Sequence, residues 1–212
     1  LQLPTASTWD LTRSGSGKRE LFAIGSQGAN RAESEILRVY DVSQLRSEKT
    51  QPVSRYTSYE GIVTALAFAN KGTMIAFCVR ERAVHRLYVA DAERLDTTLT
   101  LVQEYSHKKP WINPDGDAGA PGVTSIAFTQ DDRMLVAHGR YEEELYKLTA
   151  WSLVGEAVGS IQATETFRRE NKEKPFLSER SSRPIRFVQR PGDNVLIAED
   201  DSRFVMWNLT TG

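Results

Sequence analysis

The residue types that most often carry enzyme chemistry are few and scattered in this sequence. Two histidines, His85 and His138, each stand beside an apolar run, and no Ser, Cys or carboxylate lies at a recognisable catalytic spacing from either. The single cysteine, Cys78, excludes an intramolecular disulfide and a multi-thiolate zinc site. We therefore expect both histidines to be structural or surface residues. Because Cys78 also ends an apolar run, we expect it to be a buried core thiol.

A second group of chemistry-bearing residues is the set of arginines that recur near expected turns. Together they could form a cationic rim for an acidic peptide or a phosphate, although acidic residues in the same turns favour local pairing. These arginines are Arg31, Arg80, Arg82, Arg140 and Arg203.

The long connection between residues 106 and 122 offers one aromatic anchor and one candidate ion loop. Trp111 lies between Pro110 and Pro114, where no strand pattern would bury it, although the connection could also fold back over its own sheet. Residues 113–119, NPDGDAG, alternate oxygen-bearing side chains but lack the Gly and Glu positions of an EF-hand loop. A turn without an ion is therefore favoured.

Composition limits the class of protein. The 212 residues are 40% hydrophobic and 26% charged, which is typical of a folded globular chain. The net charge of −1 provides no basic field for nucleic acid, and no apolar run approaches the length of a spanning helix. We therefore expect neither a nucleic-acid nor a membrane partner, and the compartment stays open, with the cytoplasm favoured.

The elements that must position these residues repeat along the chain. Residues 63–68 read VTALAF, residues 123–128 read VTSIAF, and a weaker copy at 184–188 follows, so Phe68, Phe128 and Val188 are 60 residues apart. After each copy comes a polar turn and a second apolar run, at 74–77, 134–137 and 195–198. Two such runs joined by a short turn predict a β-hairpin.

Further strands complete each unit. Third strands are predicted at 37–42, 87–91, 148–153 and 204–209, and less apolar fourth strands at 53–57, 99–105 and 161–167. An earlier unit would begin with strands at 7–12 and 21–25. The chain is thus predicted to hold four units of antiparallel strands, approximately 6–58, 59–106, 121–170 and 183–212, with residues 1–5 as a closing strand for the last unit.

With these repeats the chain resembles the WD-repeat β-propeller family, whose four-stranded blades end their third strand with a Trp-Asp pair. Each unit keeps at most one half of that pair. The four dipeptides at this position are Tyr40-Asp41, Ala90-Asp91, Trp151-Ser152 and Trp207-Asn208. The resemblance implies an all-β propeller, with about four blades in this chain, that acts as a protein-interaction scaffold.

Several alternatives stay open at this point. The four units could be part of a longer propeller, half of a ring completed by a homodimer, or a small closed ring. An open half-ring would be a poor monomer, because its exposed strand edges favour a partner. The favoured function is a non-enzymatic scaffold for a protein or peptide, with no cofactor and no metal. A hydrolase or lyase with its site in the central channel, and a structural domain of a larger protein, are the competing interpretations. The expected contact residues are Trp111, Arg80, Arg82, Arg140 and Tyr141.

Overall fold

The computed structural model describes most of the chain, and all statements below concern that part. The described residues are 6–11, 19–28, 33–45, 50–59, 61–70, 74–81, 84–106, 122–142, 145–155, 161–172, 187–188, 195–200 and 203–208. They form fifteen strands and one short 3-10 helix, η1, at Val42–Gln44. No helix in this part is long and apolar enough to cross a membrane.

The strands form four separate antiparallel sheets that follow one another along the chain. Sheet A contains β1 (Ala6–Leu11), β2 (Leu21–Ser26), β3 (Glu33–Asp41) and β4 (Ser54–Tyr59). Sheet B contains β5 (Gly61–Phe68), β6 (Met74–Glu81), β7 (Val84–Asp91) and β8 (Thr100–Ser106). Sheet C contains β9 (Gly122–Phe128), β10 (Met134–Glu142), β11 (Leu145–Val154) and β12 (Gln162–Lys172). Sheet D contains β13 (Phe187–Val188), β14 (Val195–Asp200) and β15 (Arg203–Asn208).

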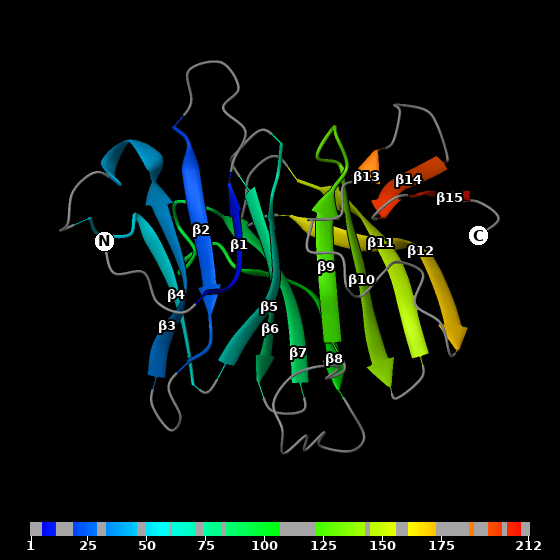
Figure 1. Cartoon of the computed structure of the whole chain (residues 1–212), viewed down its shortest axis with the longest axis horizontal. Helices are drawn as coiled ribbons and strands as arrows, with labels where there is room; N and C mark the ends of the chain where they lie inside the picture. Colours follow the sequence, from blue (N-terminus) through cyan, green and yellow to red (C-terminus); the bar gives the residue numbers. More distant parts are fainter. Residues whose placement is uncertain are drawn as a thin grey trace.

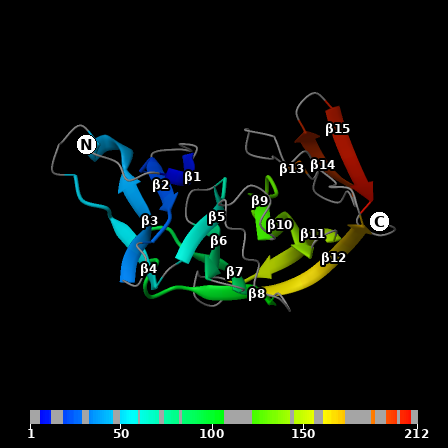
Figure 2. The ribbon, with the colours of Figure 1, turned by 60° about the horizontal axis from the view of Figure 1, so that its bottom comes forward.

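The sheets stand side by side in an open arc (Figure 1). The first strands β1, β5 and β9 line its inner side and the fourth strands β4, β8 and β12 its outer side, with sheets A and D at the two ends (Figure 2). Each strand hydrogen-bonds to the next one in sequence, so every sheet is a meander. The all-β architecture of four-stranded antiparallel units predicted from the sequence is confirmed for sheets A to C.

Equivalent residues occupy the same register position in each sheet. One residue at or near the end of each third strand faces the first residue of the second strand, in the pairs Leu21–Asp41, Met74–Asp91, Met134–Ser152 and Val195–Asn208. These are the second positions of the four degenerate Trp-Asp pairs. Asp41 and Asp91 cap the following turns by accepting hydrogen bonds from the backbone N–H groups of Ser43 and Glu93, both at 2.9 Å.

The apolar core lies between neighbouring sheets rather than within a single sheet. One cluster joins sheets A and B through Val39, Val63 and Phe77, and another joins sheets C and D through Ala150 and Trp207. Sheets B and C supply apolar residues from both faces, because each of these two sheets has a neighbouring sheet on either side.

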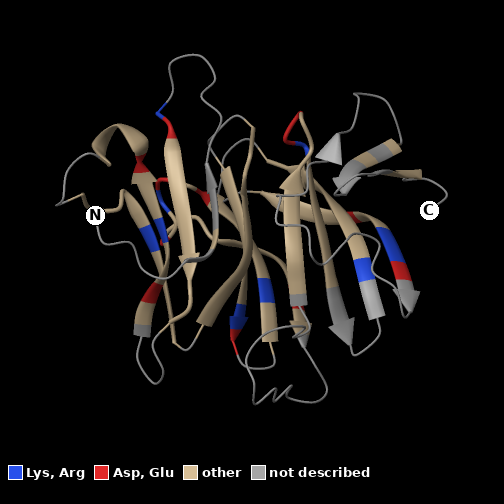
Figure 3. Cartoon of the chain, viewed as in Figure 1, with Lys and Arg blue, Asp and Glu red and all other residues tan. Residues whose placement is uncertain are grey.

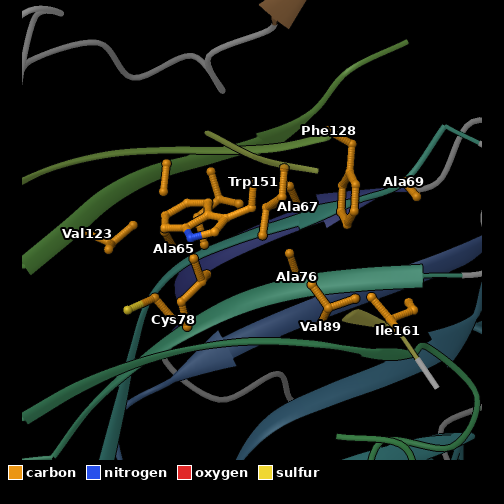
Figure 4. Packing of buried hydrophobic residues seen from close by; sticks show 14 residues of the cluster. Ala65, Ala67, Ala69, Ala76, Cys78, Val89, Val123, Phe128, Trp151 and Ile161 are labelled. Carbon is orange, nitrogen blue, oxygen red and sulfur yellow. The ribbon is translucent and has the colours of Figure 1, made fainter. Parts of the chain in front are cut away.

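The cluster between sheets B and C is centred on Trp151, which is 1% exposed. Figure 4 shows its indole ring beside small side chains of sheet B, including Ala65 and Ala67. Trp151 and Trp207, at 1% and 3% exposure, are both packing residues between sheets. Tyr40 is also buried, and Tyr88 packs against the cluster of sheets A and B.

Close approach of two sheets requires a glycine at position 25. A Cβ atom added to Gly25 would lie 2.6 Å from Val63 Cγ1 in sheet B, well inside van der Waals contact. Thr8 of β1 would lie 2.9 Å from the same atom. Only a residue without a side chain fits this position, because packed cores do not absorb an added methyl group without strain.

The main difference from the sequence-based expectation is strand length. The fourth strand predicted at 161–167 is β12, Gln162–Lys172, and its additional residues pair with β11 from Leu145 to Thr149. These additional residues are charged or polar, so an apolar pattern cannot reveal them. Backbone pairing with the neighbouring strand extends β12 regardless of side-chain polarity.

Candidate functional site

One edge of the arc contains Arg80, Arg140 and Tyr141, three of the positions to which the sequence analysis assigned function. We call it the turn edge, defined by the ends of the second strands (Ser26, Glu81 and Glu142) and of the fourth strands β4 and β8 (Tyr59 and Ser106). The pairs Glu81–Val84 and Glu142–Leu145 close the hairpins of sheets B and C at this edge. In Figure 1 the turn edge is at the bottom.

The predicted contact residues belong to this edge to different extents. Arg80 lies in β6, one residue before the strand ends, and is half-buried. Arg140 and Tyr141 lie in the last part of β10, but their side chains are not described. Arg82 and Trp111 lie outside the described residues. The connection that contains Trp111 starts after Ser106 and ends before Gly122, and both of these residues are at the turn edge.

Arg80 and Arg140 are equivalent residues of neighbouring sheets. Each pairs with an early residue of the first strand of its sheet: Arg80 with Ile62 and Arg140 with Gly122. The repeat therefore places a guanidinium-bearing residue at the same position of sheets B and C. Arg31 and Arg203 are different, because Arg31 is outside the described residues and Arg203 starts β15 of sheet D.

An ion-pair network occupies the turn edge where sheets A and B meet. Arg86 of β7 donates to Glu81 Oε2 at 2.7 Å and to Glu104 Oε2 at 2.8 Å, and Ser58 of β4 donates its hydroxyl hydrogen bond to Glu81 Oε1. The hydrogen bond with Glu104 is the main cause that raises the pKa of Arg86. Local pairing of charges, which the sequence favoured, is therefore present at this edge. Figure 3 shows both signs of charge near the lower end of sheet B.

Tyr59 is the exposed aromatic residue of the turn edge that sequence reasoning did not identify. It ends β4 next to Ser58 and is 51% exposed. The alternation of β4 contained the signal, since Ser54 and Ser58 are buried whereas Arg55, Thr57 and Tyr59 are exposed. A tyrosine that is held at a strand end with its ring in solvent is a typical contact residue in protein interfaces.

The chain passes from sheet A to sheet B directly after Tyr59, and this crossing is tight. A Cβ atom on Gly61 would lie 2.5 Å from Ser58 Oγ and 2.9 Å from Ile36 Cδ1. Gly28 also donates its backbone N–H to the Gly61 carbonyl at 2.8 Å. These contacts fix the position of Tyr59 relative to both sheets.

An aromatic cluster lies behind the ion-pair network, between sheets A and B. Tyr56, Phe77 and Tyr88 have ring centroids 5.3 to 5.9 Å apart, with tilted planes. Burial is the main cause that raises the pKa of both tyrosines. The cluster makes this seam rigid, because tilted aromatic pairs stabilise packing beyond their buried area.

The opposite edge of the arc carries a structural clamp between sheets B and C. Asp132 Oδ1 accepts the backbone N–H of Asn70 at 2.7 Å and the side-chain amide of Asn70 at 2.9 Å. The same amide donates to the Thr129 carbonyl at 2.9 Å. Asp132 is 6% exposed and has a φ of 62°, a conformation that few residues other than glycine adopt. This cluster holds two turns together, with Asp132 buried and Asn70 half-buried.

The candidate catalytic side chains are buried in the sheets. His85 in β7 and His138 in β10 are each 1% exposed, so of the two roles predicted for them, structural or surface, both are buried structural residues. Cys78 is buried, and burial raises the pKa of its thiol to about 12, so the nucleophilic thiolate is strongly disfavoured. Within the described ranges, no group of three or more His, Cys, Asp or Glu residues is placed to hold a metal ion. The loop at 113–119 is outside those ranges.

Comparison with solved structures identifies the arrangement of the sheets. The structure of the Dos1 propeller superposes on 98% of this chain with a TM-score of 0.55 and 10% sequence identity. The chain is a β-propeller segment. The crystal structure of Chaetomium thermophilum Sqt1 superposes on 90% of the chain with a TM-score of 0.51 and 16% identity. The propeller segment spans 45% of the first structure and 41% of the second.

Comparison of the amino-acid sequence with known proteins identifies no relative. No family model and no curated protein matches the propeller segment. The backbone register is nevertheless maintained at all four degenerate Trp-Asp positions.

Proposed function

We propose that this propeller segment is a non-enzymatic scaffold whose turn edge binds a protein or peptide. The proposed contact residues are Tyr59 and the residues that the sequence indicated, Trp111, Arg80, Arg82, Arg140 and Tyr141. The observation that carries the proposal is the position of Tyr59, an exposed ring that is anchored at the seam of two sheets on the same edge as Arg80 and Arg140.

The chemistry of this edge fits a partner with carboxylates and apolar groups. Arg80 and Arg140 repeat at equivalent positions of adjacent sheets, so an extended acidic segment could contact both. An exposed tyrosine adds apolar area and a hydroxyl group with little loss of side-chain entropy on binding. Glu81 and Glu104 are already paired with Arg86, so they oppose such a segment less than free carboxylates would.

The rigidity of the segment supports the same function. Sheets A and B are joined by the Ser58–Glu81 hydrogen bond at the turn edge and by the Leu95 N–H, which donates to Ser54 Oγ at 2.8 Å, at the opposite edge. A preorganised surface loses little conformational entropy when it binds. The burial of His85, His138 and Cys78 supports a binding role over an enzyme.

The test compares a turn-edge variant with a matched control from the opposite edge. The turn-edge variant combines Arg80→Ala, Arg82→Ala and Arg140→Ala, and the control is Arg133→Ala, whose side chain is 82% exposed at the opposite edge. Proteins from a source extract that bind the wild type would be purified, and their affinity for the wild type, the variant and the control would be measured by calorimetry. Equal affinity of all three proteins for every such partner would refute the proposal.

A second variant tests the aromatic anchor. Tyr59→Ala removes an exposed ring, so the fold should keep its circular dichroism spectrum and its melting temperature. We expect it to weaken binding to the same purified partner about 10-fold or more, which corresponds to an interface residue worth more than 1 kcal/mol. Leu101→Ala, at a residue that is 50% exposed on β8, is the control that should not change affinity.

A further inference from the structure

One residue, Glu81, contacts both ends of the short segment that carries Tyr59 from sheet A to sheet B. At the first end, Ser58 of β4 donates its hydroxyl hydrogen bond to Glu81 Oε1. At the second end, Gly61 of β5 pairs directly with Glu81 of β6 in the ladder of sheet B. Tyr59 therefore lies between two points that the same residue of β6 holds.

The second carboxylate oxygen of Glu81 is bonded within sheet B. Arg86 of β7 donates to Glu81 Oε2 at 2.7 Å through Nη1 and to Glu104 Oε2 of β8 at 2.8 Å through Nε. Ser58, Glu81, Arg86 and Glu104 thus form one chain of contacts from β4 across sheet B to β8. Because charge-assisted bonds of this kind are strong, Arg86 holds the carboxylate in place and directs Oε1 toward Ser58.

The surroundings of Ser58 leave little room for another arrangement. Ser58 is 5% exposed, and a Cβ atom on Gly61 would lie 2.5 Å from Ser58 Oγ. A buried hydroxyl group needs a hydrogen-bond partner, because it has lost contact with water. The bond to Glu81 supplies that partner across the seam between the two sheets.

We propose that Glu81 is a positioning residue of the turn edge, which fixes Tyr59 relative to Arg80, the preceding residue of β6. This inference rests on the proposed function, in which Tyr59 and Arg80 contact the same partner. An aromatic anchor and a guanidinium at a fixed separation select partners whose apolar group and carboxylate match that separation. Glu81 would act on partner choice through Tyr59 rather than by touching the partner.

Backbone order at Tyr59 tests this inference without any partner. NMR relaxation of the intact wild-type chain should give the Tyr59 amide an order parameter of about 0.85, the value of rigid backbone. In Glu81→Ala and in Ser58→Ala it should fall below about 0.6, the range of flexible backbone. The amides of Phe77 and Val89, both 0% exposed in β6 and β7, should keep their wild-type values.

Two further variants separate positioning from a change of charge. Glu81→Gln keeps an oxygen that can accept the hydrogen bond from Ser58, so Tyr59 should stay ordered although the charge is lost. Glu104→Ala is the matched control, since it removes the same charge as Glu81→Ala but acts at the other end of the chain of contacts, on Arg86. It should also leave Tyr59 ordered.

Affinity provides the second readout, with the protein purified on the wild type in the extract experiment as the probe. Ser58→Ala should weaken its binding about 5-fold or more when Tyr59 is present. In a Tyr59→Ala background the same substitution should have no effect, because positioning acts through that side chain.

Two results would overturn the inference. The first is a Tyr59 order parameter that stays at the wild-type value in both Glu81→Ala and Ser58→Ala. The second is an equal loss of order at Phe77 and Val89, which would show that Glu81 only maintains the fold. Unchanged affinity of Tyr59→Ala would instead contradict the proposed function, and the order parameters would still decide whether Glu81 positions this segment.

Discussion

The Asp132–Asn70 clamp allows a quantitative test of how the sheets are held together. Asp132→Ala removes a carboxylate oxygen that accepts two hydrogen bonds from Asn70, at 2.7 and 2.9 Å. Hydrogen bonds to charged groups contribute roughly 1.5 to 3 kcal/mol each. Since Asn70 is half-buried and water can replace part of this interaction, we expect a loss of about 2 to 4 kcal/mol in the free energy of unfolding.

The backbone conformation of Asp132 adds a second contribution. Its φ of 62° is tolerated by Asp, Asn and Gly but costs alanine roughly 1 kcal/mol. Asp132→Ala should therefore lose about 3 to 5 kcal/mol in total, which lowers the melting temperature of a chain of this size by about 10 °C. Asp132→Gly should be less destabilised than Asp132→Ala by about 1 kcal/mol, because glycine relieves the strain.

Equilibrium unfolding in urea, followed by circular dichroism and tryptophan fluorescence, measures these differences. Asp132→Asn is the matched control, since it retains an acceptor oxygen and the left-handed conformation, and it should lose only about 1 to 2 kcal/mol. A double-mutant cycle with Asn70→Ala should show a coupling of roughly 0.5 to 3 kcal/mol between the two residues. An Asp132→Ala variant within about 1 kcal/mol of the wild type, or strictly additive mutations, would refute this account of the clamp.

Four other outcomes follow from the packing and the titratable groups. Trp151→Ala, at a residue 1% exposed between sheets B and C, should lower the free energy of unfolding by about 3 to 5 kcal/mol in the same urea experiment. Gly25→Ala should cost about 1 to 3 kcal/mol, since the added methyl group collides with sheet B; a neutral effect there would contradict the close approach. Cys78 has a pKa raised from 9.0 to about 12 in the fold, so the unfolded state loses its proton first and stability should fall as pH rises above 9. Cys78→Ala should reduce that fall, and an unchanged pH profile would argue against burial of the thiol. The hydrogen bond from Arg55 lowers the pKa of Glu35, so the charged carboxylate stabilises the fold above the ordinary pKa of 4.5. This stabilisation is lost as pH falls through the lowered pKa. Glu35→Gln should therefore reduce the loss of stability at acid pH.

The location of the proposed surface was only partly accessible from the sequence. Turn spacing placed Arg80 and Arg140 near the ends of second strands, and the structure confirms that these positions are equivalent. Tyr59 was not identified, because its exposure depends on which face of β4 meets sheet B. A sequence pattern shows that a face alternates but does not show which neighbour covers it.

The sequence by itself determined the strand order, the hairpins and the repeat register, because those features depend on local apolar alternation and turn residues. The spacing of the repeats alone showed that Asp41, Asp91 and Ser152 occupy equivalent positions. Only the tertiary structure decided which positions are buried between sheets. Val39 and Met206 are equivalent in the repeat, yet they are 0% and 69% exposed, because the first has a following sheet against it within this chain and the second does not. Whether a residue is buried depends on the sheet that packs against it as well as on the residue itself, and that sheet is distant in sequence.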